Sequence, residues 1–111
     1  MQVEIKIIES RVLGLVAKSY YPISGGNVLN LTTFRNHQGK YISHVHGMRI
    51  NELGHEDFSI FTDFQETIAK HDVRAEINHK AIYALQEFAC GIMPAAIVRA
   101  ENFYKEKAGR K

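Results

Sequence analysis

The stretch from Val28 to Ile50, VLNLTTFRNHQGKYISHVHGMRI, decides the fold class. Apolar and polar residues alternate in both of its halves with a period of about two, which is the spacing of a β-strand. The segment between the halves contains Gly39, a residue that readily takes the positive φ of a turn. We therefore predict a β-hairpin with strands at about 28–36 and 41–50 and a loop at 36–40.

The two faces of this hairpin carry different chemistry, and the length of the loop decides which residues share them. One face of the second strand carries Ile42, His44, His46 and Met48. A loop of even length places the histidines beside Leu29, Leu31, Thr33 and Arg35, and a loop of odd length places them beside Val28, Asn30, Thr32 and Phe34. A change of one residue in register exchanges the faces, so both alternatives remain open.

Two further strands are predicted before the hairpin. Val3, Ile5 and Ile7 alternate with polar residues, as in a half-buried strand. The run from Val12 to Ala17 is apolar at both parities, which indicates a strand covered on both faces. The next segment, Ser24–Asn27, has the composition of a turn, and it lacks the further glycine or lysine pattern of a phosphate-binding loop.

The apolar period changes to about 3.6 after residue 60. Residues 58–61 suit a short strand, although Phe61 also fits a helical stripe with Phe64 and Ile68. Asp63 can cap a helix, so the strand is expected to lead into a helix there. We predict a helix over about 63–71.

A second and longer helical pattern covers about 78–107, with Asn78 as its cap. Its stripe contains Ile82, Leu85, Ala89, Ile92, Ala96, Ala100 and Phe103. Pro94 lacks the amide proton that a helix interior uses, so we expect a kink or break near Gly91–Pro94. The alternative is a single long helix that projects and packs against a second subunit.

Together these elements predict a single α+β domain over residues 1–111. An antiparallel sheet of four to five strands (about 2–61) packs against C-terminal helices (about 63–71 and 78–107, the latter kinked or broken near Gly91–Pro94). The predicted core contains Val3, Ile5, Leu13, Leu15, Val45, Phe61, Phe64, Ile82, Leu85, Ala89, Ala96 and Ala100. Cys90 lies in the apolar helix and is expected to act as a small buried hydrophobe.

Composition narrows the classes of function. The 111 residues carry a net charge of +2, which is low for a dedicated duplex-DNA binder. The single cysteine excludes an intrachain disulfide and favours a cytoplasmic protein. The N-terminus has no signal-peptide pattern, and the longest apolar run, Val12–Ala17, is about a third of a membrane span, so we expect no membrane association.

His44 and His46 form the pattern that most resembles a reactive site. Residues at i and i+2 of a strand face the same side, and two imidazoles can bind a divalent transition metal. A third ligand is needed, for which His55 is the candidate, with His37, Glu56 and Asp57 nearby in sequence. A metal-dependent enzyme is therefore one alternative function. Paired histidines at a dimer interface would instead make assembly sensitive to acid.

A second alternative is a single-stranded nucleic-acid-binding protein. Basic and aromatic residues mix around the predicted sheet, and aromatic rings on a strand face can stack bases while cations hold phosphates. The candidates are Lys18, Tyr20, Arg35, Lys40 and Tyr41.

No catalytic constellation is compelling, so an enzyme is the less favoured reading. The apolar content and the long helical stripe favour a small non-catalytic binding or regulatory protein. We expect it to act through protein–protein contacts and to form a homo-oligomer, with a homodimer as the simplest form.

Overall fold

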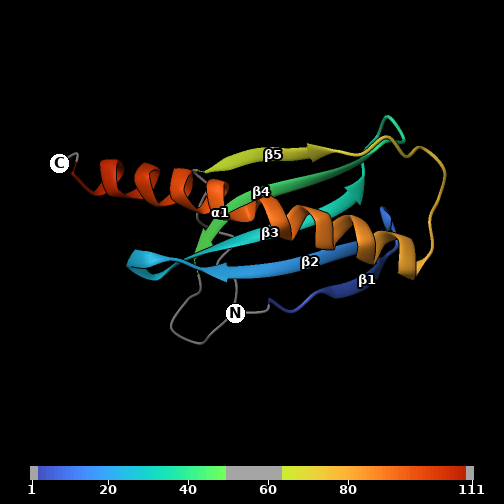
Figure 1. Ribbon diagram of the computed structural model, residues 1–111, viewed down its shortest axis with the longest axis horizontal. Coiled ribbons are helices and arrows are strands. Elements are labelled where there is room, and N and C mark those ends of the chain that lie inside the picture. The colour runs from blue at the N-terminus through green and yellow to red at the C-terminus, as the bar shows by residue number, and fades with distance from the viewer. Residues whose placement is uncertain (1–2, 50–63, 110–111) are drawn as a thin grey trace.

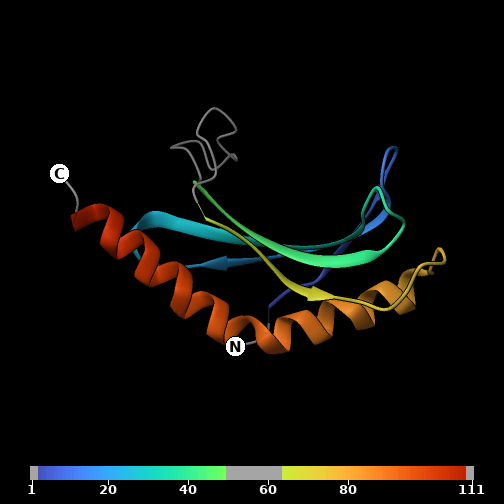
Figure 2. The same ribbon diagram turned by 90° about the horizontal axis from the view of Figure 1, so that it is seen from above.

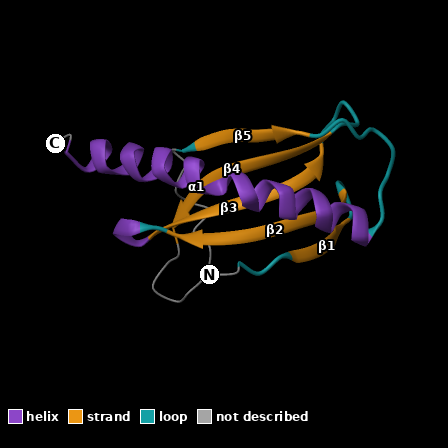
Figure 3. Cartoon of the chain, viewed as in Figure 1, coloured by secondary structure: helices purple, strands orange, loops and turns teal. Residues whose placement is uncertain are grey.

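The computed structural model describes residues 3–49 and 64–109. It contains a five-stranded antiparallel sheet and a single C-terminal helix, the α+β arrangement predicted from the sequence (Figures 1 and 3). The elements are β1 (Lys6–Ser10), β2 (Gly14–Pro22), η1 (Ser24–Gly26), β3 (Asn27–Arg35), β4 (Tyr41–Arg49), β5 (Gln65–Lys70) and α1 (His79–Gly109). Each strand pairs with the next strand in the sequence, so the sheet is a simple meander.

The β3–β4 hairpin adopts the odd alternative. Its loop has five residues, because Arg35 pairs directly with Tyr41. The Asn36 side-chain oxygen accepts hydrogen bonds from the backbone N–H groups of Gln38 and Lys40, and Gly39 has a φ of 79°. His44 consequently lies opposite Thr32, and His46 lies opposite Asn30.

The predicted helix over 63–71 is wrong, because residues 65–70 form the edge strand β5. This strand pairs with β4, and the register shifts between Ser43 and His44. Such an irregularity changes which residues face the core and so disguises the period of two. Phe64 is buried and Ile68 packs against the core, which is why their spacing also fits a helix. The predicted strand at 58–61 lies outside the described residues.

α1 runs as one continuous helix with Pro94 inside it, so the predicted break is wrong and a kink is not confirmed. At about 1.5 Å per residue its 31 residues span about 46 Å, close to the longest molecular dimension of 47 Å. The C-terminal end of α1 extends past the sheet (Figure 1). Asn78 caps the helix as predicted, since its side-chain oxygen accepts the N–H of Ala81.

The helix packs on the sheet through a stripe of completely buried residues. Its members are Ile82, Gln86, Ala89, Met93, Ala96 and Ala100, and the sheet contributes Leu29, Leu31, Tyr41 and Val45 to the same core. The spacing of four and three residues keeps this stripe on one side of α1. The small alanines allow a close approach of the helix to the strands.

Several core assignments need correction. Val45, Phe64, Ile82, Ala89, Ala96 and Ala100 are buried as predicted. Leu13 is 42% exposed because it lies in the turn between β1 and β2, and Ile92 lies beside the buried stripe at 37% exposure. Val3, Ile5, Leu15 and Leu85 pack at the margin of the core and are only half-buried. Phe61 lies outside the described residues.

Candidate binding surfaces

A network of hydrogen-bonded polar side chains, in which each group donates to the next, crosses the core between α1 and the sheet. The Thr33 hydroxyl donates to Gln86 Oε1 over 2.5 Å, and each hydroxyl carries only one proton. Ser43 must therefore donate across the 2.6 Å to Thr33, and His71 must donate through Nε2 to Ser43 over 2.8 Å. The Gln86 amide then donates to Ser19 Oγ and to the Leu31 carbonyl.

This network of hydrogen bonds fixes α1 on the sheet and does not form a reactive centre. Its serine, threonine and glutamine members are fully buried. Burial lowers the pKa of His71, which favours the neutral imidazole. Cys90 is half-buried, with its thiol 3.8 Å from Ser19 Oγ, as expected for a packing role. Burial, more than the neighbouring Cys90 thiol, raises the pKa of the Tyr21 hydroxyl above its ordinary range.

The side of the sheet opposite α1 is the first candidate surface, here called the open face. Figure 2 shows a bowed sheet with α1 along its convex side. Ser19, Thr33 and Val45 face the helix, so their neighbours in the strands face the other way. The open face therefore carries Lys6, Ile8, Val16, Lys18, Tyr20, Asn30, Thr32, Phe34, Ile42, His44, His46, Gln65, Thr67 and Lys70.

A hollow of about 320 Å³ lies on this face. Its lining includes the apolar side chains of Ile8, Val16 and Phe34, and it also includes Lys18, His44 and His46. The hollow is thus lined by apolar side chains together with one lysine and two histidine side chains. That chemistry suits a flat apolar group that carries negative charge nearby.

The structure brings His44 and His46 to the open face but completes no metal site among the residues it describes. The His44 Nδ1 atom lies 3.1 Å from the Thr67 hydroxyl, within hydrogen-bonding distance. In the described ranges, no group of three histidine, cysteine, aspartate or glutamate side chains could hold an ion. His55, the predicted third ligand, lies outside those ranges, so the metal site stays a prediction.

The five residues predicted to bind nucleic acid do not gather on one surface. Lys18 and Tyr20 lie on the open face, and Lys40 lies in the hairpin loop. Tyr41 is buried on the helix side, and Arg35 donates hydrogen bonds to the carbonyls of Gly39 and Arg74. The sequence-based prediction did not include Lys6, whose place on the open face follows only from the register of β1 with β2. Phe34 shares this face with the histidines, as the odd loop alternative predicts.

The outer side of α1 is the second candidate surface. A stripe without charged residues runs along it, here called the outer stripe: Ala84, Phe88, Gly91, Ile92, Ala95 and Val98. Phe88 is 61% exposed and Val98 is 57% exposed. Most monomeric proteins do not expose a contiguous apolar surface along four helical turns, so this stripe is typical of a contact surface.

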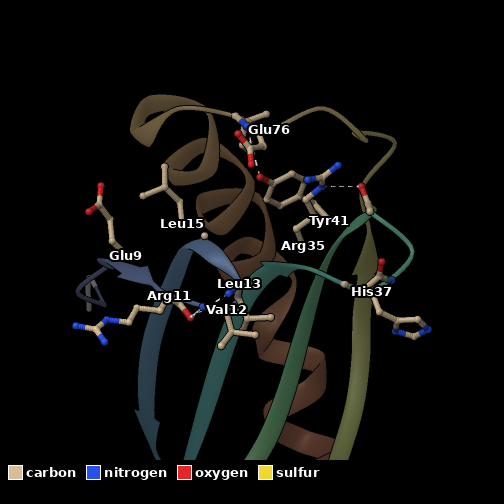
Figure 4. A pocket seen from close by; sticks show the side chains of 14 residues that line it. Glu9, Arg11, Val12, Leu13, Leu15, Arg35, His37, Tyr41 and Glu76 are labelled. Carbon is tan, nitrogen blue, oxygen red and sulfur yellow. Dashed lines mark hydrogen bonds between the residues drawn. The ribbon is translucent and has the colours of Figure 1, made fainter.

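A second hollow, of about 730 Å³, lies where the β1–β2 turn, the β3–β4 turn and the segment before α1 meet. Figure 4 shows the side chains of Glu9, Arg11 and His37 pointing away from one another. The hydroxyl of Tyr41 accepts the N–H of Ile77 and so ties this end of the sheet to the start of α1. Without converging polar groups, this hollow is the weakest of the three candidates.

Comparison with protein-family models, with curated proteins and with solved structures finds no match to this chain. Residues 79–107 of α1 have the length and apolar composition of a membrane-crossing helix. The core helix of a soluble protein can meet the same criterion, but such a helix is mostly buried, whereas 28% of the apolar window of α1 is buried inside the molecule. The cytoplasmic location and the absence of a membrane role stay predictions.

Proposed function

We propose that this protein is a small non-catalytic binding or regulatory protein that forms a homodimer through the outer stripe of α1. The single observation that carries the proposal is the exposed apolar length of that stripe. Burying such a surface against another protein removes it from water, which favours association.

A second copy of α1 is the occupant whose geometry matches the outer stripe. Ala84, Phe88, Gly91, Ala95 and Val98 follow spacings of four, three, four and three residues. That is the seam spacing of paired helices, in which side chains of one helix fit between those of the other. One self-complementary surface on each chain is sufficient for a twofold dimer. Gly91 and Ala95 leave room for close contact at its centre.

The test is the molecular mass of variants that place a charge on the stripe. A Cβ atom added at Gly91 would meet no other atom within 4 Å, so Gly91→Arg leaves the fold of the chain undisturbed. We expect Gly91→Arg and Val98→Arg to be monomeric by sedimentation velocity, because arginine on the stripe would be buried without a partner.

The matched control is Val12→Arg, which makes the same chemical change in the β1–β2 turn. Val12 is 90% exposed and lies away from α1. We expect this variant to remain dimeric. If all three variants keep the wild-type mass, the stripe is not the interface. If the wild-type chain is monomeric and floats with lipid vesicles, the stripe contacts a membrane instead and the proposal is wrong.

A further inference from the structure

An unusual row of side chains crosses the open face. The register of the five strands aligns Lys6, Lys18, Thr32, His44 and Thr67 from β1 to β5. Lys6 and Lys18 are direct cross-strand partners, an arrangement in which like charges repel and destabilise the sheet. Within the five strands no carboxylate lies on this face, so no strand residue neutralises the two lysines.

The apolar hollow lies directly beside this row and shares three of its members, Lys18, Thr32 and His44. Lys18 and His44 contribute to its lining together with Phe34, whose ring is partly exposed. Every nucleobase has a flat π-face that stacks on an aromatic ring, whatever the base sequence. Cations beside an aromatic platform are the arrangement that holds an unpaired base and its phosphates at the same time.

We propose that the open face binds single-stranded nucleic acid, with phosphates on Lys6 and Lys18 and a base against Phe34. Lys18 and Phe34 both line the hollow and Lys6 lies beside Lys18, so one extended strand can contact the lysine pair and the ring at the same time. Duplex DNA is a poorer partner, because the net charge of +2 is too small for its charge density. The open face and the outer stripe lie on opposite sides of the molecule, so this inference is independent of the proposed dimer.

The test is fluorescence anisotropy with a labelled oligothymidine of about ten nucleotides at about 0.1 M salt. Each phosphate contact contributes a salt slope of about 0.7, or about fivefold in affinity at this salt concentration. The double change Lys6→Gln, Lys18→Gln removes two contacts and should weaken binding about 25-fold and reduce the salt slope by about 1.4. The same variant should be at least as stable to urea as the wild type, because it removes a like-charge pair.

The matched control is Lys80→Gln, Lys105→Gln, which removes the same charge from exposed positions on α1. It should bind the oligonucleotide within a factor of about two of the wild type, since both lysines lie far from the open face. Phe34→Leu keeps an apolar side chain and should weaken binding about tenfold by removing the stacking ring.

Four outcomes would overturn the proposal. They are no binding at about 100 µM protein, equal losses in the two lysine double variants, a duplex of the same length bound as tightly as the single strand, and unchanged binding by Phe34→Leu. Polyphosphate that competes as well as the oligonucleotide would also contradict it, because charge alone would then explain binding.

Discussion

Replacing Gln86 with leucine tests how α1 is fixed on the sheet. Gln86 is fully buried and takes part in three hydrogen bonds, with Thr33, Ser19 and the Leu31 carbonyl. Each such bond contributes about 1 kcal/mol net, so their loss amounts to about 3 kcal/mol. Leucine fills nearly the same volume and offsets part of this loss through its apolar surface. We expect Gln86→Leu to lower the free energy of unfolding by about 2 kcal/mol.

The assay is urea unfolding followed by far-UV circular dichroism, at one fixed protein concentration because a dimer gains stability with concentration. Glu87→Leu is the matched control, since this neighbour is exposed and its replacement should change stability by less than about 0.5 kcal/mol. An equally small loss for Gln86→Leu would refute the reasoning, because it would mean that Gln86 does not lie between helix and sheet.

Gln86→Glu adds a signature that depends on the direction of the hydrogen bonds. A carboxylate can accept from Thr33 but cannot donate to Ser19 or to the Leu31 carbonyl, and its charge would be buried. This variant should therefore be less stable than Gln86→Leu at neutral pH. It should recover part of the difference in acid, where the protonated side chain regains one donor. If the stability difference between Gln86→Glu and Gln86→Leu does not change with pH, the hydrogen-bond directions assigned in the core are wrong.

Three further predictions concern single side chains. Burial holds the pKa of His71 below its ordinary 6.5, so the unfolded chain takes up this proton first as the pH falls. The contribution of His71 to stability is thus complete above about pH 6.5 and declines as the pH falls through the folded-state pKa. Between about pH 8 and about pH 5, His71→Gln should lose less of its free energy of unfolding than the wild type, as measured by urea unfolding. Equal losses in the two proteins would contradict this sign. The Tyr21 hydroxyl is buried beside the Cys90 thiol, which offers only a weak hydrogen bond, so Tyr21→Phe should leave the thermal midpoint unchanged or raise it by a few degrees, and a marked fall would show that this contact stabilises the fold. A Cβ atom at Gly47 would overlap the Tyr104 hydroxyl, so Gly47→Ala should cost about 1–3 kcal/mol in urea unfolding, and no loss would show that the end of α1 adjusts freely.

The strands and the long helix could be predicted because their apolar periods are distinct. The alternation from Val28 to Ile50 predicts the hairpin, and the stripe from Ile82 to Ala100 predicts the helix. Gly91 and Pro94 indicated a kink or a break, and the break is wrong because tertiary packing holds the helix together against local propensity. Phe64 and Ile68 indicated a helix that is also wrong, since an irregular register let residues of an edge strand mimic helical spacing.

The surfaces were harder to predict than the elements, because they depend on contacts between distant segments. A glutamine in an apolar stripe suggests an exposed position, yet Gln86 is satisfied by strand residues more than fifty positions earlier. The Lys6–Lys18 pair becomes visible only once the β1–β2 register is known. Sequence spacing placed His44 and His46 on one face but left open which residues surround them.

The mass of the wild-type chain in solution shows whether two copies of α1 pair. Each chain has a mass of 12.6 kDa. Sedimentation equilibrium of untagged protein at micromolar concentration should give twice that mass, because the outer stripe of α1 is covered by a second copy. A single mass of 12.6 kDa at every concentration up to about 100 µM would contradict the account, since an interface of ordinary size holds dimers together in this range.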